Sequence, residues 1–415
     1  MIEETKVKAS AYSWYALALL TFVYLLNFLD RQLVYALYAP IQKEFTLTDL
    51  QLSVIGASAF VLFYTTLGIP FGRMADKGSR KKLIAIGLAV WSLFSGLTGF
   101  AVGFKSLFFF RLMVGVGEAT LGPAAFSLLA DYFPPNKRAT VSSIYSMGIA
   151  LGAGLAAFLG GWIGLNYGWR WAFYLLGFPG IVFAILVFFL REEPRGKTEV
   201  QEVGYTSNDW KALLKNRPFI YICIGYSLFG LATNNLSIWG LFFYTRVYRF
   251  DIALVGFWAG ILTIIAGIPA TLLGGYIADI FRRKHKGGRM IYGSLLAIVS
   301  VPFWIILLYT NNLFLILLTN TVLRLTALGW LGAAAADVTE IAGVNLRGLA
   351  IAIFFFAVNL TAYLIGSNVI GFLSDIFGVA QNAQVMRHTL LVCPVACALG
   401  ALMLWLGSKE MNQQT

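Results

Sequence analysis

The chain has 415 residues, of which 59% are apolar and only 12% are charged, and its mean hydropathy is +0.76. A soluble domain carries about 25% charged residues, so this composition excludes an ordinary soluble enzyme, a disordered protein and a nucleic-acid binder. The formal net charge of +12 has another explanation in a membrane protein, in which lysine and arginine are retained on the cytoplasmic side.

Twelve apolar segments follow one another along the chain. A transmembrane helix needs about 20 apolar residues, and the predicted spans are 14–37, 50–72, 83–103, 106–130, 139–164, 169–190, 219–244, 253–278, 290–309, 312–336, 348–374 and 386–407. The segments are continuously apolar and lack the alternating polarity of a membrane β-barrel. The sequence therefore predicts an all-α membrane protein with twelve transmembrane helices.

The basic residues are divided unequally between the two sides of these spans. If the amino terminus lies inside, most of the 31 lysines and arginines fall in inside segments. This asymmetry predicts that both termini are cytoplasmic. We expect a multi-pass protein of the plasma membrane, the inner membrane of a bacterium.

An internal repeat divides the chain into two halves. A Gly-x-x-x-Asp sequence follows span two and recurs after span eight, and Asp131 at the end of span four recurs as Asp337 at the end of span ten. This pattern predicts two homologous six-helix halves, residues 1–190 and 219–415, which is the architecture of an alternating-access carrier. The polar linker between them, 191–218, contains either a short amphipathic helix around Trp210 or a solvated connection with one helical turn.

The loop after span two identifies a family. From Gly72 it reads GRMADKGSRK, which is close to the G-x-x-x-D-R-x-G-R-R signature of the major facilitator superfamily. The chain resembles this superfamily over essentially its whole length, although Ser79 stands where the family has glycine. The resemblance implies the major facilitator fold, with two pseudo-symmetric halves around a central cavity.

The charges of this loop and of its repeat predict a conformational latch at the cytoplasmic side. Exposed ion pairs are weak enough to break in each transport cycle. The alternative is that these charges only set the topology. The predicted latch residues are Gly72, Asp76, Lys77, Arg80, Lys81, Asp279 and Arg282.

Three further segments narrow the resemblance. Span one contains NFLDR from Asn27, span four contains Arg111 and then GVGEA from Gly115, and span six begins with WRWAF from Trp169. Together they resemble the Spinster-like transporters. The anion:cation symporter branch of the superfamily shares the first two elements and stays as the alternative.

Four charged residues in the N-terminal half lie inside the predicted spans. A charge inside the membrane is costly, so such residues usually face a cavity and form pairs. Span one places Asp30 and Arg31 at a depth between Arg111 and Glu118 of span four, which lie on one face two turns apart. We expect Asp30 to pair with Arg111 and Glu118 with Arg31. The alternative is a pair of static salt bridges that only join the two helices.

The same four residues are the predicted proton-coupling network. His285 lies in a loop and His388 lies near the outer end of its span, so a proton carrier deep in the membrane must be a carboxylate. Burial favours the protonated acid and a nearby arginine favours the carboxylate, so breaking the Arg31 contact would switch Glu118 between the two forms. Asp30 is the alternative carrier, and uncoupled uniport or sodium coupling are alternative modes.

Polar residues near the middle of the spans are the predicted substrate site. Arg324 is the charge buried in the C-terminal half, and without a local acidic partner it is suited to an anionic group of the substrate. Its alternative partner is Glu118 at a matching depth. The asparagines either bind the substrate or join helices. The predicted substrate-binding residues are Asn27, Asn234, Asn235, Trp239, Arg324, Asn359 and Tyr363.

The predicted function is therefore secondary active transport. The three cysteines and two histidines predict neither a disulfide scaffold nor a metal site, and the absence of G-x-S-x-G and H-E-x-x-H motifs predicts that the chain is not an enzyme and needs no cofactor. The Spinster resemblance implies an amphipathic substrate such as a lysophospholipid or sphingoid phosphate, moved by proton-coupled alternating access. A sugar-acid type proton symporter and an uncoupled uniporter are the alternatives. We expect protons, the solute and membrane lipids as partners, no nucleic acid, and a functional monomer.

Overall fold

The computed structural model describes residues 10–134, 137–194 and 213–413, apart from the side chains of 76, 138–139, 143 and 343–348. In these ranges the structure contains twelve helices that are long and apolar enough to cross a membrane. The predicted all-α class and the predicted number of spans are confirmed. The amphipathic helix predicted around Trp210 lies outside the described residues.

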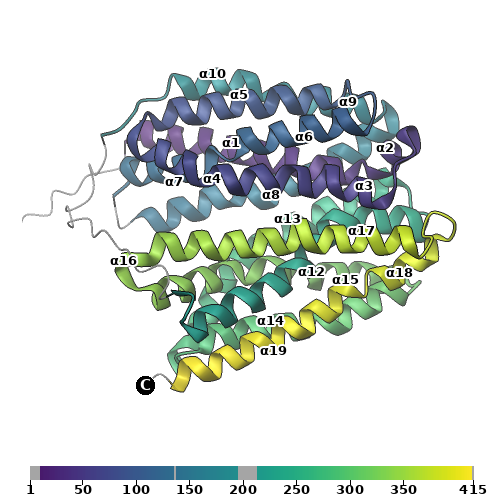
Figure 1. The fold of residues 1–415 in the computed structure, drawn as a ribbon. Coiled ribbons are helices and arrows are strands. Elements are labelled where there is room, and N and C mark those ends of the chain that lie inside the picture. The colour runs from purple at the N-terminus through teal and green to yellow at the C-terminus, as the bar shows by residue number, and fades with distance from the viewer. Residues whose placement is uncertain (1–9, 135–136, 195–212, 414–415) are drawn as a thin grey trace, which may run out of the picture.

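The helices of the first six spans gather in one layer, drawn in purple to teal in Figure 1. Kinks and short breaks divide several spans into two labelled helices. The elements are α1 (Ala11–Ala36), α2 (Tyr38–Phe45), α3 (Asp49–Ser53), η1 (Val54–Ser58), α4 (Ala59–Lys77), α5 (Arg80–Thr98), α6 (Phe104–Glu118), α7 (Leu121–Tyr132), α8 (Arg138–Asn166), α9 (Trp169–Gly177) and α10 (Gly180–Phe188).

The helices of the last six spans form the second layer, drawn in teal to yellow (Figure 1). Helix α13 packs along α8 of the first layer, so the two layers share a long contact. The elements are α12 (Arg217–Val247), α13 (Ile252–Lys284), α14 (Gly288–Tyr309), α15 (Leu313–Gly329), α16 (Leu331–Asn359), η3 (Leu360–Gly366), α17 (Ser367–Ile376), η4 (Ala383–Val385), α18 (Met386–Thr389) and α19 (Val392–Gln413).

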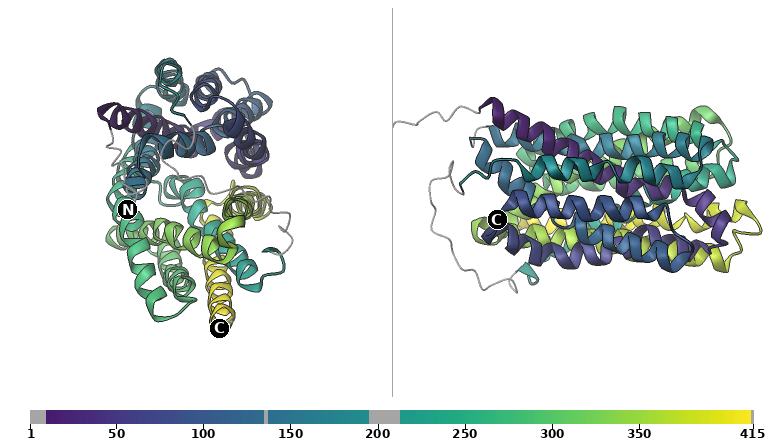
Figure 2. Two further views of the ribbon diagram at one scale, coloured as in Figure 1. Left: turned by 90° about the vertical axis from the view of Figure 1, so that its left-hand side faces the viewer. Right: turned by 90° about the horizontal axis from the view of Figure 1, so that it is seen from above.

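The two ends of the bundle differ in their charged groups. Helix α1 begins and α19 ends at the same end, as both views in Figure 2 show. We call this the basic end, because it carries Lys77, Arg80, Lys137, Arg283 and Arg289. The other end, reached by α2, α3, α9 and α18 (Figure 1), is called the opposite end.

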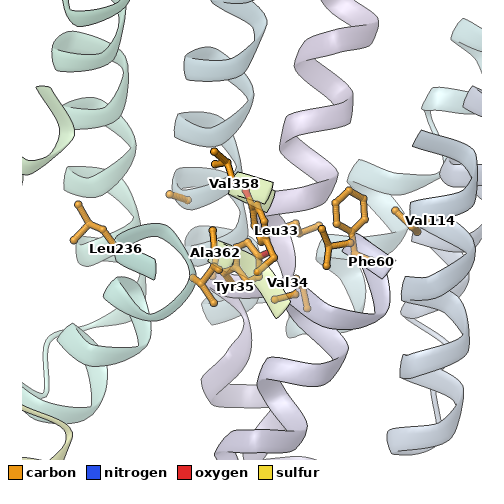
Figure 3. Packing of buried hydrophobic residues seen from close by; sticks show 14 of the residues in the cluster. Leu33, Val34, Tyr35, Phe60, Val114, Leu236, Val358 and Ala362 are labelled. Carbon is orange, nitrogen blue, oxygen red and sulfur yellow. The ribbon is translucent and has the colours of Figure 1, made fainter. Parts of the chain in front are cut away.

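The core of the bundle is apolar and crosses from one layer to the other. Tyr35, Phe60, Leu236 and Ala362 are all buried members of one packed cluster. Figure 3 shows residues from both layers gathered in the middle of the molecule. Because the lipid side also accepts apolar residues, this internal packing and the buried polar groups together fix how the helices sit against one another.

Two spans contain a wide helical turn where they approach each other. The π-helical turns are η1, in the span that continues into α4, and η3, in the span that continues into α17. The turns η1 and η3 contact each other across the two layers. Such turns insert an extra residue into a helix and are frequent at functional sites.

Candidate functional site

An ion pair lies buried in the N-terminal half. The Arg31 side chain donates from Nε and Nη2 to Glu118 Oε2, at 3.2 and 2.9 Å. The rings of Phe28, Phe60 and Tyr64 surround the guanidinium, with centroids 4.8, 4.5 and 4.7 Å away. The predicted pairing of Glu118 with Arg31 is therefore confirmed, and aromatic faces add to the stabilisation of the cation.

The second predicted pair is wrong. The Asp30 carboxylate accepts a hydrogen bond from the Ser95 hydroxyl of α5, and Arg111 of α6 makes no hydrogen bond within the described structure. Successive residues of a helix point about 100° apart, so when Arg31 is directed at α6 its neighbour Asp30 is directed at α5. Asp30 and Arg111 were compared by depth on two helices, but Ser95 on a third helix, α5, contacts the Asp30 carboxylate.

Several polar atoms around this pair have no hydrogen-bond partner. They are the three side-chain nitrogens of Arg111, which have no partner among the described residues. The Asn27 amide lies beside the Glu118 carboxylate. Arg111 is fully buried and Glu118 is 1% exposed. Unsatisfied buried polar groups cost about 1–3 kcal/mol each. The cluster of Asp30, Arg31, Arg111 and Glu118 is thus balanced in charge but incompletely hydrogen-bonded, which suits a site that changes its bonding during function.

The predicted asparagines of the C-terminal half have two different roles. Asn235 is fully buried and donates to the carbonyls of Leu231 and Ala362, at 2.8 and 3.3 Å, so it joins α12 to η3. Asn234 accepts from the Tyr363 hydroxyl at 2.8 Å, and it is only partly buried. Asn235 therefore matches the helix-joining interpretation, and Asn234 with Tyr363 stays a candidate for substrate contact.

Tyr363 connects the two halves. Its hydroxyl lies next to the Arg31 guanidinium as well as bonding to Asn234. A chain of polar contacts therefore runs from Glu118 through Arg31 to η3 and α12 in the other half. A change in the Glu118–Arg31 pair would therefore alter the contacts of Tyr363 and Asn234 in the C-terminal half.

Arg324 occupies a separate polar position on α15. Its Nε donates to Asn320 Oδ1 at 2.8 Å, and Asn320 donates to the Tyr244 hydroxyl at 2.6 Å. The Arg324 side chain has no acidic partner in the part of the chain that the structure describes, and the alternative pairing with Glu118 is absent because Glu118 binds Arg31. Asn320 precedes Arg324 by one helical turn, a spacing that sequence analysis could have used.

A small cavity adjoins Arg324. Its volume is about 20 Å³, enough for about one water molecule. Both halves contribute to it, because Gln32 and Ala153 belong to the first half and Ser237 and Thr263 to the second. Sequence analysis did not select Gln32, Ser237 or Thr263, since short uncharged polar residues are common in membrane helices. The cavity provides hydrogen-bonding groups beside a buried cation.

Two further residues that were predicted to bind the substrate, Trp239 and Asn359, lie in other surroundings. Trp239 is fully buried and packs on Tyr38 and Phe242, with ring centroids 5.6 and 6.0 Å apart. It therefore contributes to the contact between the halves in this structure. Asn359 is half-buried at the end of α16, next to η3.

The predicted latch residues of the first half form a cluster within that half. Arg80 forms ion pairs with Asp131 of α7 and with Glu192, the latter at 2.9 Å. Partial burial opposes ionisation of Glu192, but hydrogen bonds from Ser79, Arg80 and Lys81 outweigh it and lower the Glu192 pKa. Glu192 follows α10 and was missed, because nothing in the sequence marks its proximity to α5.

The other predicted latch residues of the first half are Gly72, Asp76, Lys77 and Lys81. The Lys81 ammonium donates to the Leu190 carbonyl at 2.6 Å, and Lys77 is exposed. Gly72 is partly exposed, and the Asp76 side chain lies outside the described part of the structure. The described contacts of Arg80 and Lys81 stay in the N-terminal half.

The second half has a corresponding cluster at the basic end. Arg289 contacts Asp279, Asp337 and Glu340 at 2.8, 3.4 and 2.8 Å, and Arg282 also pairs with Glu340. Arg289 and Glu340 were missed, although Asp337 was recognised as the repeat of Asp131. The described ion pairs of Arg80 and of Arg289 do not cross between the halves, and the predicted latch between the halves stays a prediction.

The chain is similar to known membrane transporters in sequence and in fold. The Major Facilitator Superfamily model matches residues 20–329. An MFS-type efflux pump of Mycolicibacterium smegmatis is 27% identical over 97% of this chain and 94% of its own. A probable sphingolipid transporter, spinster homolog 1 of Arabidopsis thaliana, is 30% identical over 58% of this chain and 54% of its own. The crystal structure of a bacterial homolog of the human lysosomal transporter Spinster, inward-facing and unoccupied, has a TM-score of 0.80 at 23% identity, covering 98% of this chain and 97% of that chain.

Proposed function

Since the chain belongs to the Major Facilitator Superfamily and resembles Spinster-type transporters, we propose that it moves an anionic solute across the membrane by proton-coupled alternating access. The family and the fold are those of membrane transporters. The observation that carries the proposal is the buried Arg31–Glu118 pair, which lies in contact with Tyr363 of the other half. A buried charge pair is a poor source of stability, so its presence favours a functional role.

The basic end is the cytoplasmic side in this proposal. Lysine and arginine are retained in the cytoplasm, so both termini face it. The protein is then a multi-pass protein of the bacterial plasma membrane that works as a monomer among its lipids. The hydrogen bonds between the halves at the opposite end, such as those of Asp375 with α3, correspond to a carrier that is closed to the outside.

Protonation of Glu118 is the coupling step. The carboxylate takes a proton, which removes its charge and weakens both hydrogen bonds from Arg31. The released guanidinium can then bond to Tyr363 or to the solute, and loss of the proton on the other side restores the pair. Asp30 is the second candidate for the proton, because it is buried beside the same cluster.

The solute binds between the halves near Arg324. A lone buried arginine matches the charge of a phosphate or carboxylate head, and Gln32, Ser237 and Thr263 add hydrogen-bonding groups around the cavity. The sphingolipid transporter among the relatives supports a lysophospholipid or sphingoid phosphate. A sugar acid is the alternative, since it offers the same charge without an apolar tail.

A binding screen followed by transport tests this proposal. Purified protein is heated with lysophosphatidic acid, sphingosine phosphate or glucuronate, and the melting temperature is measured with and without each ligand. The expected result is stabilisation by a lipid phosphate and no response to glucuronate. In proteoliposomes the stabilising ligand should accumulate when an inward proton gradient is imposed. Uptake that stops at equal concentrations on the two sides and does not depend on the proton gradient would support the uncoupled uniporter instead.

A further inference from the structure

One acidic side chain of the second half caps a helix of the first half. The Asp375 carboxylate on α17 accepts from the backbone N–H groups of Asp49 at 2.8 Å and of Leu50 at 3.0 Å. These are the first residues of α3, which continues through η1 into α4 as one span. The first N–H groups of a helix have no partner within it, and a negative charge there is stabilised by the helix dipole.

An arginine of the second half adds an ion pair at the same place. Arg246, near the end of α12, donates to Asp49 Oδ2 at 2.6 Å and to Gln42 Oε1 at 2.7 Å. Gln42 in turn donates to Asp49 Oδ1 at 2.7 Å. Asp49 is 3% exposed, so both of its oxygens are engaged and its carboxylate is shielded from water.

Close packing of the backbones supports these contacts. A Cβ atom on Gly371 of α17 would lie only 2.8 Å from the Asp49 carbonyl oxygen, so only glycine allows the two helices to approach this closely. One turn deeper, Ser53 donates to Asn368 Oδ1 at 2.7 Å, and Ser58 donates to the same oxygen at 3.0 Å. The interface between α3 and α17 is therefore specific in shape as well as in charge.

We propose that Asp375, Arg246 and Asp49 form a latch that holds the opposite end closed and opens in each transport cycle. This inference rests on the proposed alternating access, and it names the contacts that oppose opening to the outside. The bonds that Asp375 and Arg246 make to the first half all cross between the halves, so separating the two halves at this end breaks them together. The Arg246 side chain is 14% exposed and the group lies at the end of the bundle, where water can solvate the partners once they separate.

A second aspartate provides a matched control. Asp251 also caps a helix at the opposite end, accepting from the N–H groups of Ala253 and Leu254 at 2.8 and 3.2 Å. These partners belong to α13 of its own half. Loss of the Asp251 charge therefore weakens a helix cap of the same kind while leaving the bonds of Asp375 and Arg246 in place.

The test measures the distance between the halves directly. Spin labels are placed at the exposed positions Lys43 and Gln381, and double electron–electron resonance gives the distance distribution in the full-length protein. Asp375→Asn should raise the population of the longer distance about two- to fivefold, the factor that corresponds to removal of a negative charge from a helix N-terminus. Gly371→Ala should act in the same direction through steric contact, and Asp251→Asn should leave the distribution unchanged.

The outcomes separate the latch from the transport proposal. An unchanged distribution in both Asp375→Asn and Gly371→Ala, with folding verified by size-exclusion chromatography, would overturn the latch. If Asp375→Asn fails to fold, Arg246→Gln supplies the same comparison. Because the distance measurement needs no substrate, a shifted distribution would support the latch even if every tested solute fails to be transported.

Discussion

The interiors of the two halves are charged in different ways. In the N-terminal half the buried Asp30, Arg31, Arg111 and Glu118 balance one another. In the C-terminal half Arg324 is bonded to Asn320, and the described residues give it no acidic partner. A balanced cluster can take up or release a proton through local rearrangement, whereas an uncompensated arginine attracts an anion. The difference suggests that proton binding and solute binding are divided between the halves.

This division requires communication between the halves. The Arg31–Tyr363–Asn234 contacts provide a direct route from the first half to the second. If these contacts couple the halves, changes in the N-terminal cluster should alter proton coupling, and changes at Arg324 should alter solute binding.

Glu118→Gln should abolish proton-driven accumulation while preserving exchange. Glutamine is nearly isosteric with the protonated acid, so the protein is locked in one form of the proposed switch. Accumulation in proteoliposomes under a proton gradient should fall to the level without a gradient, and counterflow of labelled against unlabelled solute should persist. Glu44→Gln is the control, because Glu44 forms its ion pair with Arg170 at the surface. Normal accumulation by Glu118→Gln would exclude Glu118 as the proton carrier.

Arg324→Gln should weaken solute binding by about 10- to 100-fold, because a charge-assisted hydrogen bond contributes about 1.5–3 kcal/mol. The number of protons moved per solute should stay the same, since the proton cluster is intact. Both quantities can be measured in proteoliposomes from the concentration dependence and from reversal potentials. Arg324→Lys keeps the charge and should recover part of the affinity. A change in proton stoichiometry with unaltered affinity would reverse the assignment of the two halves.

Arg31→Ala should move the pH dependence of transport upward. Without the arginine, the Glu118 carboxylate loses the group that favours its charged form, so transport that depends on protonation of Glu118 should persist to higher pH. The rate of transport measured from pH 5 to pH 9 gives the midpoint, and Arg31→Lys should keep it close to the wild-type value. A midpoint that does not move in Arg31→Ala would leave the pair as a static link between α1 and α6.

Glu192→Gln should have the smallest effect and should leave coupling intact. The lowered Glu192 pKa means that its charged form stabilises the fold at neutral pH, and that this contribution is lost as the pH falls below the ordinary range of a glutamate. Glu192 is exposed and its charge is screened by water, so we expect a decrease of about one degree in melting temperature at pH 7. The difference from the wild type should disappear near pH 3. A persistent difference at that pH would indicate a role other than its charge.

The sequence predicted the spans and one of the central pairs for identifiable reasons. Hydrophobic length defines a span, and counting residues along α1 and α6 placed Arg31 and Glu118 at similar depths. The same counting failed for Asp30, because Ser95 on a third helix was equally near in space. Contacts such as Asp375 with Asp49 or Arg80 with Glu192 join segments that are far apart in the chain. They depend on how whole helices are positioned, which no local pattern records.

The wide turns η1 and η3 change the direction in which the side chains beyond them point. One additional residue in a helical turn rotates everything beyond it by about 100° about the helix axis. In the second span this lets Ser53 point toward α17 while Phe60 and Tyr64, on the far side of η1, point toward Arg31. A single helix can thus serve the interface at one level and the ion pair at another. Removing one residue from 54–58 would allow either the contact of Ser53 with α17 or the contacts of Phe60 and Tyr64 with Arg31, but not both at once.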